Sequence, residues 1–228
     1  KPTKKTRPVT IDSDQFRPFD PDTESLRKFE KNMAAFKTKF PELASKLAAL
    51  KSTATTLIVS ENSEFDIEFQ GEKFFHGGSR TWAEERVKGF EKKPMAQRLT
   101  AATLDSANLD EVANQAIFRF TKQCVETHGM KFATGPVDKF SFHLIVLGVG
   151  LGDHLPLLVE NTDCRNLILF EPNLEFLFHS MFAFDWSKLI DDFDMPGRRL
   201  WLYTERTAPE IAIRVRDAIR YMGPNFAD

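Results

Sequence analysis

The chain has 228 residues, 42% of them hydrophobic and 28% charged, a composition that supports a packed core and excludes global disorder. Its 31 basic and 33 acidic side chains give a formal charge of −2, so no strong positive field gathers nucleic acid. No apolar run reaches the roughly 18 residues of a membrane span, and the opening KPTKKTR lacks the apolar stretch of a signal peptide. We therefore expect neither nucleic acid nor a membrane as partner.

Cysteine and histidine usage points to a reducing compartment. Cys124 and Cys164 are too few for a disulfide framework in a chain of this length, which favours a cytoplasmic location. There is no CxxC pair and the five histidines lack ligand spacing, so no metal site is predicted. Because the chain has no initiator Met, we expect it to be processed or cut.

The N-terminal part predicts an arm followed by two helices. Residues 1–21 combine Lys and Arg with four prolines, which favours a flexible basic arm or an extended strap. From Leu26 to Phe40, apolar residues recur at three- and four-residue steps, as on one face of a helix. Pro41 suits the first turn of a second helix.

A change of period then indicates strands. Between Thr53 and Gly78, TTLIVS and the alternating FDIEFQ predict a small antiparallel β-meander with a Gln-Gly turn. Trp82 to Phe90 predicts a short helix, and a longer one is expected from Asn108 to Cys124, with Cys124 in its buried stripe.

A Gly-Pro loop around residues 129–138 marks the predicted boundary between two parts, residues 22–135 and 136–228. The first part holds the helices and the meander.

The second part alternates strands and helices. The apolar run Phe142 to Leu147 predicts a central parallel strand covered on both faces. Glycines follow at 148, 150 and 152, a helix begins at Asp153, and NLILF at 166–170 predicts a second strand that ends at Glu171. RLWLYT at 199–204 predicts a third strand, and Thr207 to Glu210 forms a capping box before a final helix. The predicted fold class is α/β: a small α+β region with an antiparallel β-meander, then a partial Rossmann-like parallel sheet with flanking helices.

The glycines at the strand end are typical of a nucleotide site. They permit a tight turn, and the helix behind them presents unpaired N–H groups to an anion. Glu171 lies 19 positions past Gly152, where a strand-tip carboxylate accepts bonds from ribose hydroxyls. The GxGxG spacing is closer to S-adenosylmethionine-dependent methyltransferases than to the dinucleotide GxGxxG. The alternative is that the glycines only permit close packing of helix on strand.

The following residues predict structure rather than catalysis. Asn173 is expected to cap the next helix, and His179 within that helix is interpreted as a core histidine. Only three strands of the parallel sheet are predicted, and neither an NPPY-like tetrapeptide nor GxSxG occurs. We therefore expect a fragment of a longer protein, with its catalytic residues unknown.

Two segments, LGVGLGDHLPLLVE and ILFEPNLEFLFHSMFAFDW, resemble the motility accessory factors, the flagellin glycosyltransferase family. In that family a GLGLG-type loop, with a histidine two residues on, precedes a strand ending in Glu-Pro-Asn. The N-terminal helix, the IEFQGEKFF hairpin and the Trp82 helix look like the family's first domain. The resemblance covers about residues 25–205 and is strongest at 144–186, although Asp153 stands where an aromatic residue is expected.

The resemblance implies cytoplasmic transfer of a nonulosonic acid, of pseudaminic or legionaminic type, from a CMP-sugar to flagellin Ser or Thr. It associates the transfer chemistry with a central domain that follows this one and is missing here. The implied partners are flagellin and the remaining domains of the same chain. The residues that match the motif positions are Gly148, Gly150, Gly152, His154, Glu171, Pro172 and Asn173. All of these except Pro172 are candidates for holding a nucleotide or CMP-sugar.

Three hypotheses follow. The first is an N-terminal domain that recognises flagellin or organises the glycosyltransferase. The second is a methyltransferase-like domain that binds S-adenosylmethionine through the glycine loop and Glu171. The third is a protein-binding module whose surface is the apolar helix 174–184 or the basic arm.

Overall fold

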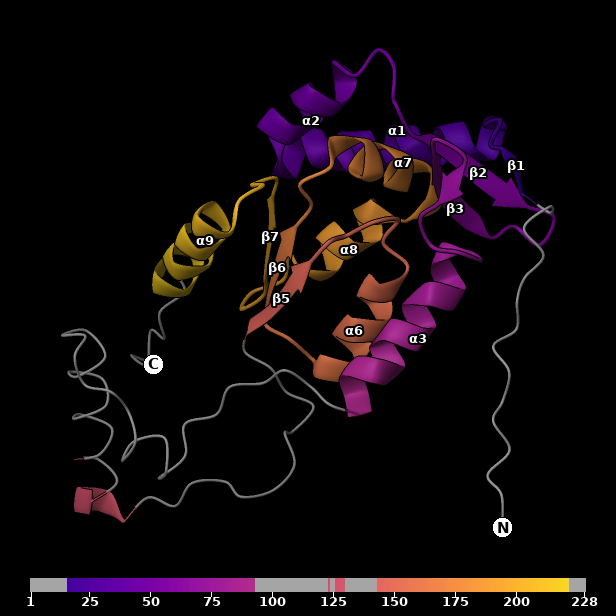
Figure 1. The fold of residues 1–228 in the computed structure, drawn as a ribbon. Coiled ribbons are helices and arrows are strands. Elements are labelled where there is room, and N and C mark those ends of the chain that lie inside the picture. The colour runs from indigo at the N-terminus through magenta and orange to yellow at the C-terminus, as the bar shows by residue number, and fades with distance from the viewer. Residues whose placement is uncertain (1–15, 93–122, 124–125, 130–142, 222–228) are drawn as a thin grey trace, which may run out of the picture. The chain divides into compact units, whose positions relative to one another are not determined.

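The structure is a computed structural model that describes residues 16–92, 123, 126–129 and 143–221 (Figure 1). Residues 1–91 and 139–228 belong to one compact unit, and residues 92–138 belong to another. Apart from residue 123, which is helical, the predicted helix at 108–124 lies outside the described residues, and so does the predicted boundary near residue 135.

The two predicted N-terminal helices are confirmed as α1 (Thr23–Lys39) and α2 (Pro41–Ala48). Asp22 caps α1 by accepting the Ser25 N–H at 2.8 Å. Phe40 ends the first helix and precedes Pro41, so the chain turns between the helices at a single residue. Met33 and Phe36 form the buried face of α1, as the apolar spacing predicted.

The predicted meander is an antiparallel sheet of order β1-β2-β3-β4. Its register places Leu57 opposite Ile67, and Gln70 and Gly71 turn the chain with φ of 53° and 84°. The edge strand β1 comes from the end of the predicted arm, so residues 16–18 form the extended strap rather than a flexible tail. The strands are β1 (Phe16–Pro18), β2 (Thr56–Ser60), β3 (Phe65–Phe69) and β4 (Glu72–Lys73), and α3 (Ser79–Lys92) follows them.

The C-terminal part of the unit contains a parallel sheet of order β5-β6-β7, in which each strand is followed by a helix (Figure 1). The helix α8, between α7 and β7, is one that the sequence patterns did not predict. The capping box is confirmed, since the Thr207 N–H donates to the Glu210 carboxylate at 3.1 Å and the Glu210 N–H donates to the Thr207 hydroxyl at 3.5 Å. The elements are β5 (His143–Leu147), α6 (His154–Thr162), β6 (Asn166–Phe170), α7 (Leu174–Ala183), α8 (Trp186–Asp192), β7 (Arg199–Tyr203) and α9 (Ala208–Tyr221).

The prediction that the first of these strands is central and covered on both faces was wrong. Among the described strands of this sheet, β6 takes the central place and all five of its residues are buried. In β5, Leu144 and Val146 pack into the core, but Ile145 is 40% exposed and Leu147 is 68% exposed. An apolar run shows which side chains a strand carries, but it does not show which strands pair with it. The position of the strand in the sheet could therefore not be predicted from it.

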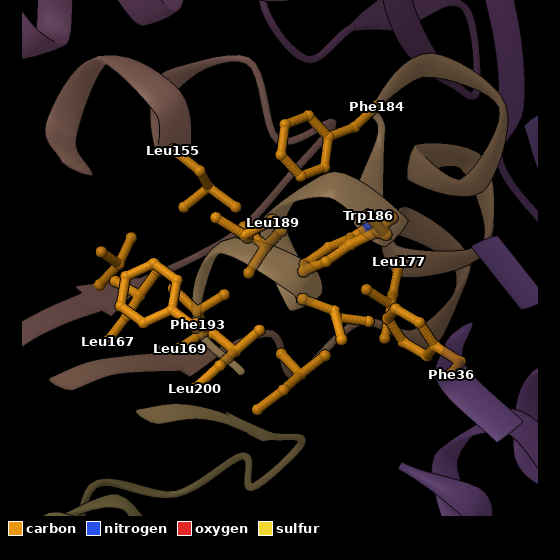
Figure 2. Packing of buried hydrophobic residues seen from close by; sticks show 14 of the residues in the cluster. Phe36, Leu155, Leu167, Leu169, Leu177, Phe184, Trp186, Leu189, Phe193 and Leu200 are labelled. Carbon is orange, nitrogen blue, oxygen red and sulfur yellow. The ribbon is translucent and has the colours of Figure 1, made fainter. Parts of the chain in front are cut away.

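One hydrophobic core joins the two ends of the unit (Figure 2). Phe36 from α1 packs edge-to-face on Trp186 of α8, with ring centroids 5.2 Å apart. Leu155 and Leu189 lie in the same cluster as the sheet residues Leu167 and Leu169. The helix α1 therefore packs on α7 and α8, and these elements share one core with the parallel sheet.

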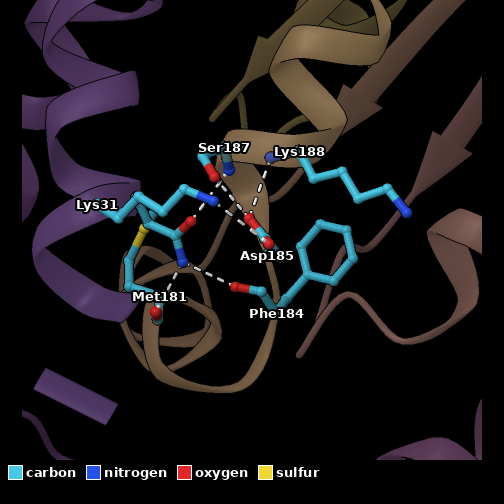
Figure 3. Close-up of polar contacts among 7 residues, drawn as sticks. Lys31, Met181, Phe184, Asp185, Ser187 and Lys188 are labelled. Atoms are coloured by element: carbon cyan, nitrogen blue, oxygen red, sulfur yellow. Dashed lines mark hydrogen bonds and ion pairs between the residues drawn. The ribbon is translucent and has the colours of Figure 1, made fainter. Parts of the chain in front are cut away.

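A buried amide adds polar specificity to this core (Figure 3). The Asn32 side-chain N–H groups donate to the carbonyl oxygens of Met181 at 2.9 Å and Phe184 at 2.7 Å. The Asn32 oxygen accepts the Ser187 N–H at 3.0 Å. Asp185 also accepts the Lys188 N–H at 3.0 Å and so begins α8. These bonds fix the corner between α7 and α8 against α1.

Candidate functional site

The candidate site lies at the carboxyl edge of the parallel sheet, where the glycine loop follows β5. Gly148, Gly150 and Gly152 have φ of 88°, 53° and 91°, a backbone region that residues other than glycine rarely adopt. The loop thus has the tight turn that the sequence predicted. The structure brings it together with Glu171, His154 and Asn173, and we call this group the glycine corner.

Glu171 follows β6 and points back into the glycine loop. One carboxylate oxygen, Oε2, accepts the N–H groups of Val149 at 2.9 Å and Gly150 at 2.8 Å. The other, Oε1, accepts the Asn173 N–H at 2.9 Å. The side chain is only 3% exposed. The loop amides that suit an anionic ligand are therefore bonded to a carboxylate of the protein itself.

The surroundings of this carboxylate have two opposite effects on its pKa. Burial raises the pKa of Glu171, while the three backbone N–H groups favour the ionised form. Burial is the larger effect. The net effect is therefore a raised pKa, and the main-chain N–H groups offset only part of the cost of burying the charge.

His154 closes the other side of the loop. It begins α6, it is buried, and it hydrogen bonds to the Gly148 backbone. Burial lowers its pKa to about 4, so the ring is neutral at pH 7. The Trp82 ring of α3 meets it edge-on with centroids 6.0 Å apart.

Asn173 caps α7 as predicted, because its side-chain oxygen accepts the Glu175 N–H at 3.0 Å. Pro172, between Glu171 and Asn173, is exposed. Asn173 thus bonds both to the corner, through its backbone N–H, and to the helix, through its side chain.

The space beside two of the glycines is filled by aromatic rings. A Cβ atom at Gly150 would lie 2.9 Å from Cζ of Phe75, and one at Gly152 would lie 2.7 Å from Cγ of Phe184. A Cβ at Gly148 would meet nothing within 4 Å. Close packing therefore requires glycine at 150 and 152, whereas only the backbone conformation requires it at 148.

The sequence reasoning missed two carboxylates beside the corner. Asp153 accepts a short hydrogen bond from the Ser79 hydroxyl, and burial raises its pKa. Burial likewise raises the pKa of Glu64, against which Gly78 packs. The departure at Asp153 from the family pattern was the available signal. Its partner is 74 residues away, a pairing that no local spacing reveals.

The helix α7 carries a second buried network. The Thr55 hydroxyl donates to Glu175 at 2.6 Å and lies 3.0 Å from Nε2 of His179. Burial lowers the pKa of His179. The prediction of a satisfied core histidine is confirmed.

The apolar residues of α7 also have partners within the unit. Phe178 and Phe182 pack on Phe29 of α1, and Phe176 packs on Phe74 beside the meander. This corrects the hypothesis that residues 174–184 form a free protein-binding surface.

Neither a metal site nor a membrane span is found in the described part of the chain. Over those residues, no three His, Cys, Asp or Glu side chains are grouped so that they could hold a metal ion. Within the same ranges, no helix combines the length and the apolar character needed to cross a membrane.

Known proteins place the chain in one family. The profile described as "Glycosyltransferase Maf N-terminal domain" matches residues 28–228. The solved structure of a MAf glycosyltransferase from Magnetospirillum magneticum AMB-1 matches with a TM-score of 0.63 and 27% identity over 86% of this chain. The match spans 30% of that glycosyltransferase chain. No curated protein sequence matches. The expected resemblance to motility accessory factors is confirmed, and the chain belongs to the Maf glycosyltransferase family, whose N-terminal domain it contains.

Proposed function

We propose that this domain recognises flagellin, or organises the transferase around it, in an enzyme that moves a nonulosonic acid from a CMP-sugar to flagellin Ser or Thr. The sugar transfer itself takes place in the part of the enzyme that corresponds to the remaining length of the Magnetospirillum relative, of which this chain matches 30%. The compartment of this activity is the cytoplasm.

The observation that supports a role other than nucleotide binding is the internal occupation of the glycine corner. The Val149 and Gly150 amides, which would receive a phosphate or a cofactor carboxylate, are bonded to Glu171. Phe75 and Phe184 fill the space at Gly150 and Gly152. A ligand there would have to displace a bound carboxylate and two packed rings, which favours a structural role for this corner.

The proposal is tested with flagellin and an activated sugar. The immobilised chain is expected to capture purified flagellin. The same chain, incubated with flagellin and a CMP-activated nonulosonic acid, is expected to leave the mass of flagellin unchanged. Sugar transfer by this chain alone would contradict the proposed division of labour, and failure to capture flagellin would contradict recognition.

A truncation separates the basic arm from the folded domain in this capture. The deletion should remove residues 1–15 and keep Phe16–Pro18, because β1 pairs with β2. Unchanged capture assigns recognition to the folded unit, whereas lost capture assigns it to the arm.

Calorimetric titration tests the competing methyltransferase-like function. Neither S-adenosylmethionine nor CMP is expected to release heat on mixing with the chain. Micromolar binding that is abolished in Glu171→Ala and retained in the exposed control Glu160→Ala would favour a cofactor site at the corner instead.

A further inference from the structure

The strand β7 has a main-chain edge that no other described strand pairs with. The Arg199 N–H donates to Arg165 O at 2.9 Å, and Tyr203 O accepts the Glu171 N–H at 2.9 Å. In a parallel ladder, alternate residues bond to the same neighbour, so residues 199, 201 and 203 face β6. The N–H and C=O groups of Leu200 and Leu202 therefore face the other way, toward the open edge.

A groove of about 600 Å³ runs along this edge. All five residues of β7 line it, so it follows the edge of the strand rather than one face of the sheet. Lys39 and Phe40, at the corner between α1 and α2, also line it, together with the loop residues 193–198. Such a groove offers hydrogen bonds on one side and side chains on the other, which suits an extended chain.

The charged residues that line the groove are mostly basic. Lys39, Arg198 and Arg199 supply three positive charges, and Asp194 supplies one negative charge. Arg199 is exposed. Lys39 pairs with Asp194 at 2.8 Å and Arg198 pairs with Asp163 at 2.8 Å, but surface pairs of this kind are weak and exchange readily for other partners. The balance complements acidic side chains on a partner.

The groove also has an apolar part. Met195, in the loop before β7, is 60% exposed and lies in the lining with Phe40. Methionine adapts its shape to different apolar side chains. An occupant with apolar residues between its acidic ones would therefore match both features.

We propose that this groove binds an extended, acidic polypeptide segment, which adds to the sheet as a fourth strand beside β7. The main-chain groups of Leu200 and Leu202 give the pairing, the basic residues select acidic side chains, and Met195 receives an apolar one. This inference rests on the proposed recognition role, for which it names the contact surface and the chemistry of the recognised segment.

The probe is a fluorescein-labelled hexapeptide of alternating glutamate and valine, titrated with the chain and followed by fluorescence anisotropy. Two matched peptides separate the contributions: one is N-methylated at its valines, and the other carries lysine in place of glutamate. Each change is expected to weaken binding at least 10-fold. The first removes main-chain donors and the second reverses the charge.

Protein variants locate the contact. Arg199→Glu is expected to weaken binding about 10-fold, while Lys88→Glu, the same charge change on the exposed side of α3, leaves it unchanged. The amide hydrogens of Leu200 and Leu202, followed by NMR hydrogen exchange, should exchange more slowly when the unmethylated peptide is bound.

The possible outcomes test the groove as a peptide-binding site separately from the proposed recognition of flagellin. Equal binding of the N-methylated peptide, unprotected amides at Leu200 and Leu202, or displacement by CMP or inorganic phosphate at millimolar concentration would overturn the strand-addition proposal. If flagellin is captured but the hexapeptide does not bind, the recognition role stands and the groove assignment falls. If the hexapeptide binds as described but flagellin is not captured, the groove stands and flagellin as partner falls.

Discussion

The glycine corner and the β7 groove belong to the same three-stranded sheet but differ in whether their main-chain polar groups already have hydrogen-bond partners. At the corner, the loop amides of Val149 and Gly150 are bonded to Glu171 and the side chains around them are buried. Along the groove, main-chain groups of β7 face the open edge and Met195 is 60% exposed. The corner has the sequence pattern of a ligand site, while the groove has none. A binding surface is recognised here by main-chain and side-chain groups that can still contact a partner. A sequence motif alone does not show whether such groups are already bonded within the protein.

The closure of the corner follows from proximity. A carboxylate held on the tip of β6 competes with any dissolved anion at a high effective concentration for the loop amides. Because Glu171 is also fixed by the Asn173 N–H, little conformational freedom is lost when it binds. A strand-tip acid can therefore stabilise the turn that, in other proteins of this architecture, receives a cofactor.

The largest expected effect comes from Gly152→Ala at the closed corner. The added Cβ would lie 2.7 Å from Cγ of Phe184 at a backbone φ of 91°, so strain and overpacking act together. We expect the free energy of unfolding to fall by about 3 kcal/mol in a denaturant titration. Gly148→Ala is the matched control, because its φ is 88° but its Cβ meets nothing within 4 Å, and it should lose about half as much. Equal losses would show that packing at Gly152 adds nothing.

Glu171→Gln tests the structural role of the buried carboxyl group with an isosteric change. The amide has one acceptor where the carboxylate has two, so one of the N–H groups of Val149, Gly150 or Asn173 loses its partner. We expect a loss of about 2 kcal/mol of unfolding free energy by the same titration. The exposed control Glu160→Gln should change it by less than about 0.5 kcal/mol. A neutral or stabilising result at Glu171 would contradict the structural role and reopen the corner to a ligand.

Local patterns were sufficient to predict much of this fold. The spacing from Leu26 to Phe40 predicted α1, the alternation in FDIEFQ predicted the meander, and Asn173 was recognised as a helix cap. These signals succeed because helix periodicity, strand alternation and capping depend on neighbours in the sequence.

Features that depend on distant residues were not predictable in this way. The edge position of β5 depends on which strands pair, and the closure of the corner depends on the direction of the Glu171 side chain. The Asn32 network joins residues about 150 positions apart. The groove along β7 also combines α1, a loop and a strand, so no single segment carries its signature.

The pH dependence of the free energy of unfolding tests the glycine corner through the buried His154. Burial lowers the pKa of His154 to about 4, so between that value and 6.5 the unfolded chain binds more protons than the folded one. Stability from this group is thus fully present above pH 6.5 and is lost as the pH falls toward 4. Between pH 8 and pH 5.5 we expect a loss of about 1 kcal/mol that is absent in His154→Gln.

The comparison between wild type and His154→Gln is needed because other groups titrate in the same range. The lowered pKa of His179 adds a loss in the same direction, whereas the raised pKa of Glu171 opposes it, since the folded state then holds its proton more tightly. Only the difference between the two proteins isolates His154. Parallel curves of unfolding free energy against pH would contradict a neutral, buried ring.

The smallest effect on stability is expected in the groove itself. Met195→Ser changes a side chain that is 60% exposed, so the unfolding free energy should stay within about 0.5 kcal/mol of the wild type. Met181→Ser, the same change at a fully buried position of α7, should cost about 3 kcal/mol and is the matched control. The affinity for the glutamate–valine hexapeptide should nevertheless fall about threefold in Met195→Ser, since an apolar contact is lost. A destabilisation above 1 kcal/mol would instead show that Met195 supports the fold, and the contrast between a closed corner and an open groove would not hold.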